Sequence, residues 1–203
     1  MVKTSKKTTY KKNFYKGKSK LGYYLRNYAK ARHDVAFNIL MNRSGLQFKE
    51  TEARTATIDS LLNKCKDYSK YRDLYASMKI TGIALNVIPG GFFNEINASS
   101  PAQITGYFQW VGNVALSYLT SSEEANYSDV IESDNCLILS QQNTASKYIS
   151  FGKYGGSNGW FDTTNQESSI PGKLAIAASE LPVYGAATWS VKISIYVTYK
   201  IRA

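Results

Sequence analysis

The sequence has few of the residues on which most enzyme and metal sites depend. It contains one histidine, His33, and two cysteines, Cys65 and Cys136, in 203 residues. A Ser-His-Asp or Cys-His catalytic site would have to use that histidine, which directly follows a lysine-rich segment that is a poor setting for a rigid site. A single histidine and two distant cysteines are too few ligands for a zinc site. We therefore expect no enzyme, no metal and no other cofactor, and expect His33 to be an exposed or partly buried linker residue.

Long apolar runs and targeting signals are also missing. No stretch approaches the roughly 20 apolar residues that a membrane span needs, so we expect no membrane insertion. No secretory leader is visible in the lysine-rich first residues, and two cysteines do not make a disulfide framework for a chain of this length. We expect synthesis in a reducing compartment.

Two segments resemble ligand-binding loops but lack the necessary spacing. The glycine-rich run 155–159 has no Gly-Lys-Ser/Thr ending, so it predicts a surface loop rather than a phosphate site. The acidic residues Glu123 and Glu124, with Asp129, Glu132 and Asp134, lack the alternating ligands of a calcium loop. We interpret these acidic residues as a solvated loop.

The positive charge is concentrated at one end of the chain. Residues 1–32 carry eleven lysines and arginines and no acidic residue, whereas residues 33–203 carry fourteen basic and fifteen acidic side chains, a net charge of −1. This division predicts a cationic arm, residues 1–32, joined to a nearly neutral body, residues 33–203. Such an arm repels itself when free and is attracted to polyanions.

The composition of the arm favours single-stranded nucleic acid. Lysines displace counterions from phosphates without reading sequence, and aromatic rings offer faces on which unpaired bases stack. A solubilising tail or a nuclear-import signal is the alternative interpretation. The residues predicted to bind nucleic acid are Lys3, Lys6, Lys7, Lys11, Lys12, Lys16, Lys18, Lys20, Arg26, Lys30, Arg32, Tyr10, Phe14 and Tyr15.

The end of the arm leaves two structural interpretations open. Residues 1–20 have nothing to pack into a core and are expected to be disordered without a partner. In residues 21–32, apolar side chains at Leu21, Tyr24, Leu25 and Tyr28 follow the spacing of one helix face. The segment is therefore either a short helix or a continuation of the disordered arm.

The body has the pattern of an all-β protein. From Val191 to Arg202, apolar and polar residues alternate without interruption, which places one face of a strand on a core. A second long strand is expected over 76–88, ending at Pro89, and a helix over 57–65. Further strands are expected over 35–41, 46–54, 104–112, 114–119, 136–140, 146–151 and 173–178. This count favours an eight-stranded jelly-roll sandwich.

Several features resemble the capsid proteins of small circular single-stranded DNA viruses of the circovirus type. A basic N-terminus leads directly into an all-β body, and the chain closes on a long strand. Between them, Tyr68, Tyr71, Arg72 and Pro89 resemble a Tyr-x-x-Tyr-Arg element that enters a long strand ending at proline. The resemblance implies a jelly roll and a minimal icosahedral (T=1) shell of about 60 copies.

The predicted function is therefore a self-assembling capsid protein that packages single-stranded DNA or RNA. Its expected partners are other copies of itself, the genome and a host cell-surface receptor, and its expected locations are the virion and the host nucleus or cytoplasm. The alternatives are the coat protein of a satellite-type RNA virus, a non-viral nucleic-acid-binding protein and a jelly-roll carbohydrate-binding module. Large apolar residues predicted to form subunit contacts, or else core, are Phe92, Phe93, Trp110, Trp160 and Phe161.

Overall fold

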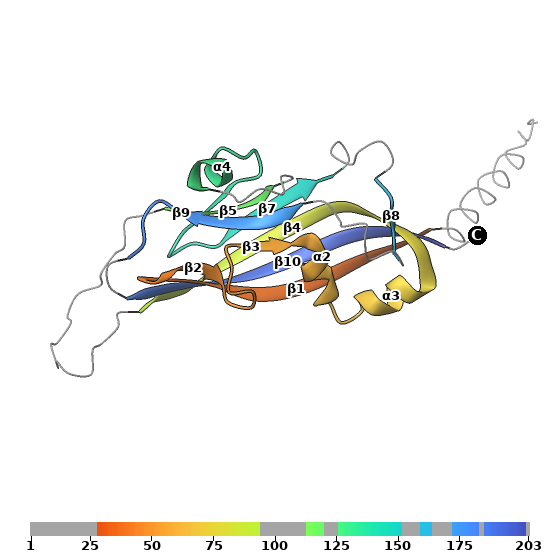
Figure 1. Cartoon of the computed structure of the whole chain (residues 1–203), viewed down its shortest axis with the longest axis horizontal. Helices are drawn as coiled ribbons and strands as arrows, with labels where there is room; N and C mark the ends of the chain where they lie inside the picture. Colours follow the sequence, from red (N-terminus) through yellow and green to blue (C-terminus); the bar gives the residue numbers. More distant parts are fainter. Residues whose placement is uncertain are drawn as a thin grey trace, which may run out of the picture.

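The structure is a computed structural model that describes residues 28–93, 113–119, 126–151, 159–163, 172–182 and 185–201. Two antiparallel sheets stack face to face, with short helices against them (Figure 1). The larger sheet has the order β2-β1-β10-β4-β7, and β8 pairs with β4. Its strands are β1 (Tyr28–Asn42), β2 (Gly45–Phe48), β4 (Tyr75–Phe93), β7 (Ala145–Ser150), β8 (Phe161–Asp162) and β10 (Ala186–Ile201).

The smaller sheet has the order β3-β9-β5-β6. Successive main strands cross repeatedly from one sheet to the other, and the eight strands other than β2 and β8 divide four and four. This arrangement is a jelly roll, so the predicted fold class is confirmed. The strands of the smaller sheet are β3 (Thr55–Thr57), β5 (Val114–Leu119), β6 (Leu137–Leu139) and β9 (Lys173–Ala178).

The core follows from the alternation in β10, which is the centre of the larger sheet. Every second residue from Ala187 to Tyr199 is buried, and the residues between them point away from the core. Full burial of one such side chain, for example Ile193, stabilises the fold by about 1.5–3 kcal/mol. The indole N–H of Trp189 also donates to the Ser140 carbonyl at 2.8 Å, so the largest core side chain leaves no unpaired polar atom.

Three short helices lie against the sandwich. Helix α2 (Ile58–Asn63) confirms the helix expected over 57–65 and is capped by the Thr57 hydroxyl. Helix α3 (Tyr68–Leu74) leads directly into β4. Helix α4 (Tyr127–Ile131) covers the outer face of the smaller sheet, where buried Val130 packs on small side chains.

The acidic segment expected to be a solvated loop instead contains α4. The Asp129 carboxylate accepts from the Asn126 N–H at 2.9 Å, and the Asn126 side-chain oxygen accepts from the Asp129 N–H at 2.9 Å. This reciprocal pair is a capping box, which satisfies two N–H groups at the start of the helix. The prediction is wrong at Asp129 because a carboxylate three residues after asparagine caps a helix.

Of the two interpretations left open for residues 21–32, a short helix or a continuation of the disordered arm, neither holds for the residues that the structure describes. Residues 28–32 belong to β1, which pairs with β10 from Tyr28 to Asn42. Ala29 and Ala31 pack against the core and continue the alternation of β1. Pairing with a long neighbouring strand therefore outweighs the local helical spacing. The remainder of that segment, residues 21–27, lies outside the described residues.

Two predicted strand ends also differ from the structure. The strand expected over 46–54 stops at Phe48, where the chain turns through Glu52 at a positive φ of 53°. The strand expected to end at Pro89 continues to Phe93, because a register shift opposite Thr188 and Trp189 accommodates the Pro89–Gly91 segment. The predicted strand over 104–112 lies outside the described residues.

Candidate nucleic-acid interface

Of the residues predicted to bind nucleic acid, the structure describes two. Lys30 and Arg32 are exposed on β1, rather than in a segment that precedes the folded body. The other twelve, Lys3, Lys6, Lys7, Lys11, Lys12, Lys16, Lys18, Lys20, Arg26, Tyr10, Phe14 and Tyr15, lie outside the described residues. The arm therefore remains a prediction, and the geometry of the described part has to be considered on its own.

The outward face of the larger sheet is strongly basic. Residues paired across antiparallel strands share a face, so the outward residues of β1, β10, β4 and β8 can be read from their register. Five of them are cations and two are anions, a net charge of +3. We call this surface the basic face, and its charged residues are Lys30, Arg32, Asp34, Lys79, Asp162, Lys192 and Lys200.

Asp34, one of the two anions of the basic face, is already paired. Asp34 accepts from the Ser194 hydroxyl at 2.6 Å and from Arg32 at 3.0 Å, and Lys192 lies 3.8 Å from it. The Ser194 hydrogen bond and then the two cations hold the pKa of Asp34 below its ordinary value. Among the described residues, Lys30, Lys79 and Lys200 form no ion pair. They are available to an external polyanion.

Aromatic rings lie among these cations. Tyr148 on β7 is 58% exposed, and its ring lies 5.9 Å from that of Tyr196 on β10. The Tyr148 hydroxyl end lies over Gly82 of the intervening strand, where any larger residue would meet the ring. A second pair, Tyr28 and Trp160, has ring centroids 5.9 Å apart. The face thus offers two aromatic platforms beside lysines.

This combination suits single-stranded nucleic acid. Lysines neutralise phosphates, and exposed aromatic rings stack with unpaired bases at about 1–3 kcal/mol per base. The sequence alone did not predict that the folded body contributes to this interface, because the net charge of −1 of residues 33–203 averages over all faces of the sandwich. The signal was present in the last strand, whose alternation turns Lys192, Tyr196 and Lys200 to the side opposite the core.

His33 is not the exposed or partly buried linker residue that the sequence suggested. It is 2% exposed on β1, and its Nε2 lies 2.7 Å from the Tyr199 hydroxyl. The rings of Tyr68, Tyr71 and Tyr199 meet it edge-on, with centroids 5.3–5.9 Å away. Burial lowers the pKa of His33, against smaller opposing effects of Asp67 and Asp34. The histidine therefore packs in an aromatic cluster under the first half of β1.

The residues that resembled a capsid motif build the same cluster. Tyr68 is buried in α3, and burial raises its pKa to about 12. Tyr71 stacks on Tyr199 with ring centroids 5.0 Å apart. In this structure the Tyr-x-x-Tyr-Arg element fixes α3 against β1 and β10 and so sets where β4 begins.

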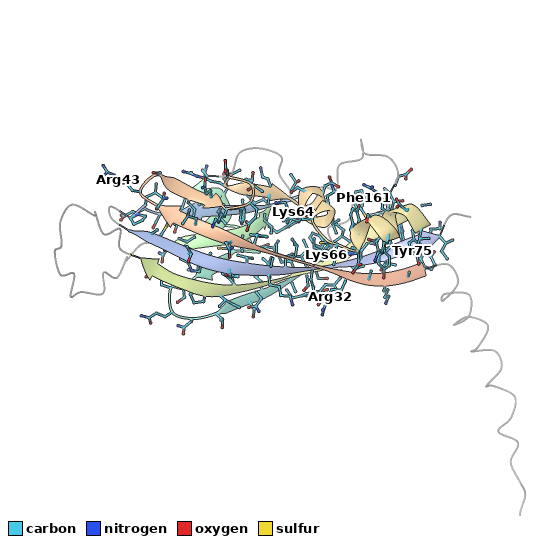
Figure 2. All side chains as sticks on the ribbon, turned by 90° about the horizontal axis from the view of Figure 1, so that it is seen from below. Arg32, Arg43, Lys64, Lys66, Tyr75 and Phe161 are labelled. Carbon is cyan, nitrogen blue, oxygen red and sulfur yellow. The ribbon has the colours of Figure 1, made fainter. Side chains whose placement is uncertain are left out.

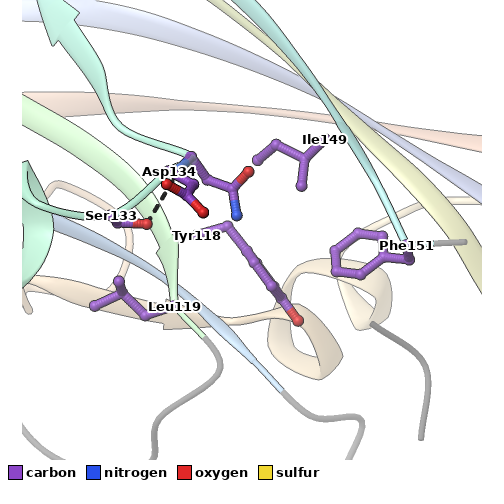
Figure 3. A pocket seen from close by; sticks show the side chains of 7 residues that line it. Tyr118, Leu119, Ser133, Asp134, Ile149 and Phe151 are labelled. Carbon is purple, nitrogen blue, oxygen red and sulfur yellow. Dashed lines mark hydrogen bonds between the residues drawn. The ribbon is translucent and has the colours of Figure 1, made fainter. Parts of the chain in front are cut away.

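A hollow of about 170 Å³ opens between the two sheets near β5 and β7 (Figure 3). Its walls include Tyr118, Ile149 and Phe151, and the Asn135 N–H donates to the Ser133 hydroxyl at 3.3 Å beside it.

Within the described parts of the chain, no three His, Cys, Asp or Glu side chains gather as a metal site would require. No helix among the same residues is long and apolar enough to cross a membrane.

The large apolar residues considered for subunit contacts divide between core and surface. Phe161 packs against the core, whereas Trp160 is 36% exposed. The side chains of Phe92, Phe93 and Trp110 lie outside what the structure describes. Of the two described residues, only Trp160 therefore remains a candidate for an external contact.

No protein-family model and no curated protein sequence matches this chain. Solved structures do match it. A giant freshwater prawn Macrobrachium rosenbergii nodavirus virus-like particle matches with a TM-score of 0.59 at 8% identity, over 100% of this chain and 95% of that one. Cocksfoot mottle virus matches with a TM-score of 0.56 at 10% identity, over 87% and 96%.

Mud crab tombus-like virus matches with a TM-score of 0.53 at 8% identity, over 86% of this chain and 90% of that one. These matches extend over nearly all of each chain, although few residues are identical. They bear on the fold and do not confirm the circovirus type to which the sequence pointed. What the comparisons establish is that this chain has the jelly-roll fold of viral capsid proteins.

Proposed function

We propose that this chain is a viral capsid protein that assembles with copies of itself into a closed shell and packages single-stranded nucleic acid. The observation that carries the proposal is the basic face. On a capsid-type jelly roll whose residues 28–203 have a net charge of only +1, a net charge of +3 is gathered on one side of one sheet, beside exposed and half-buried aromatic rings. A surface of this kind would face the enclosed genome.

The arm and the basic face would then act together. The chain enters the larger sheet at Tyr28, which pairs with Lys200 on the same face, so the lysine-rich residues 1–27 lead into the basic face. Both elements bind phosphates without sequence preference, which suits a genome of varied sequence. The shell would be a small icosahedron of about 60 copies, and the genome single-stranded DNA of the circovirus type or RNA. No catalytic step is proposed.

Electron microscopy of the purified full-length protein tests this function. We expect uniform round particles whose ratio of absorbance at 260 to 280 nm shows bound nucleic acid. Deletion of residues 1–27, which spares β1, should leave particles but lower that ratio. If the deleted protein forms particles that retain all their nucleic acid, the arm is not a binding element.

A second candidate is a non-viral protein that binds single-stranded nucleic acid without forming a shell. The observation that favours it is again the basic face, because such a protein needs cations on its folded body. The two functions differ in assembly. A discrete monomer or dimer at every salt concentration would support the second function and contradict the capsid.

A further inference from the structure

The first half of β1 has an unpaired edge. Strand β2 pairs with β1 only from Ile39 to Asn42. Just before this, the Asn38 N–H donates to the Glu50 carboxylate at 3.0 Å, and the Asn38 carbonyl accepts from the Lys49 N–H at 2.8 Å. Asn38 therefore directs its backbone groups away from β10, toward this edge.

Backbone direction alternates along a strand, so four earlier residues direct their N–H and C=O groups to the same side as Asn38. No described residue bonds to those groups on that side. The sheet edge thus has an unfilled ladder, which is the usual template for an added strand. The four residues are Lys30, Arg32, Asp34 and Ala36.

A hollow of about 440 Å³ runs beside this edge. One wall is β1 from Arg32 to Ala36, and the other is the segment Lys64–Asp67 that joins α2 to α3. Figure 2 labels three of its lining residues, Arg32, Lys64 and Lys66. The buried residues that line the hollow are His33, Val35 and Cys65, so two of the three side chains at its floor are apolar. We call the hollow and the unpaired edge together the edge groove.

We propose that residues 21–27 of a neighbouring copy bind in the edge groove as an additional strand of the larger sheet. This inference rests on the proposed function, because it needs copies that meet in a shell. In this segment, Leu21, Tyr23 and Leu25 alternate with Gly22, Tyr24 and Arg26, so an extended segment presents apolar side chains on one face. That face would cover the floor of the edge groove.

Charge selects this segment over the residues before it. The groove is lined by Arg32, Lys64 and Lys66 and by two aspartates, a net charge of +1. Residues 1–20 carry eight lysines and would be repelled, whereas residues 21–27 carry a single arginine. The lysine-rich part stays available for nucleic acid when the shorter apolar part binds the neighbour.

Chain geometry favours binding of a neighbour's residues 21–27 in the edge groove over binding of the chain's own residues 21–27. A tight reversal just before Tyr28 would place Leu25 opposite Tyr28 and Leu21 opposite Arg32, so the apolar residues would not reach Ala36. The two residues at that reversal, Arg26 and Asn27, include no glycine, which tight hairpin turns favour. The arm of another copy has neither restriction.

Disulfide trapping between two differently tagged chains tests the proposal. Both full-length chains carry Cys65→Ser and Cys136→Ser, since serine can keep the hydrogen bond that the Cys65 thiol donates to the Leu61 carbonyl. One chain also carries Asp34→Cys at the edge, and the other carries Tyr24→Cys in the arm. The control replaces the edge cysteine with Asn86→Cys, an exposed position in the middle of the same sheet face. Oxidation follows co-assembly of the mixed chains.

We expect a mixed-tag disulfide dimer with Asp34→Cys and at most a trace with Asn86→Cys. A further sample carries Asp34→Cys and Tyr24→Cys on the same chain. A disulfide that forms in this sample but not between differently tagged chains would assign the groove to the chain's own arm and overturn the proposal. Particles that form with nucleic acid but give no disulfide would also overturn it, while leaving the capsid function intact. If no particles form, both proposals fail together.

Discussion

Removing three lysines from the basic face should change how salt weakens nucleic-acid binding. The variant is Lys79→Gln, Lys192→Gln and Lys200→Gln in the full-length chain. Each phosphate contact to a single strand contributes about 0.7 to the slope of log K against log salt, so losing three contacts should lower that slope by about 2. Fluorescence anisotropy with a labelled oligothymidine, titrated at several salt concentrations, measures the slope directly.

The control for this experiment removes the same charge elsewhere. Lys49→Gln, Arg54→Gln and Lys70→Gln change three exposed cations that lie in a turn, in a bend and in α3, outside the strands of the larger sheet. We expect the control to keep nearly the wild-type slope, since its effect is limited to long-range electrostatics. Equal slopes for the two variants would refute the argument, because net charge alone would then explain binding.

Further predictions concern stability. Because burial lowers the pKa of His33, the unfolded chain takes up its proton first, so the free energy of unfolding should fall as pH drops below about 6.5, by up to about 1.4 kcal/mol per pH unit. In His33→Phe, the free energy of unfolding measured by urea denaturation should depend less on pH over this range. An equal pH dependence in the variant and the wild type would contradict this. Trp189→Phe leaves the Ser140 carbonyl without its donor and should cost about 1–3 kcal/mol, against under about 0.5 kcal/mol for the exposed Trp160→Phe. Asn126→Ala removes the cap of α4 and should cost about 1 kcal/mol in thermal unfolding, and no loss would mean that the capping box is not stabilising.

Much of the fold follows from local pattern. The apolar runs of β5 and β9 predict those strands to the residue, because both faces of each strand are buried. Strict alternation predicts β10 from Val191 onward but misses its first five residues, 186–190. The Asn126–Asp129 spacing would also have predicted α4 had it been considered as a cap rather than as a group of charges. These features are encoded within a few residues of where they act.

Other features depend on distant partners. The start of β1 at Tyr28 depends on pairing with Lys200, and the bulge that lets β4 continue past Pro89 depends on Thr188 and Trp189. The basic face needs the register of several strands at once, since Lys79 and Lys192 are far apart in the chain. Total charge could not reveal this face, because it sums the charges of the whole chain without regard to where they lie.

Photocrosslinking of intact particles tests the central claim most directly. Irradiation should join the packaged nucleic acid to aromatic residues of the basic face, and mass spectrometry of the digested protein locates the adducts. The account predicts adducts on the exposed rings of Tyr148 and Trp160 and on the half-buried ring of Tyr196, which lie beside its lysines. Adducts that avoid these three residues and fall on other surfaces of the body would show that this face does not line the interior.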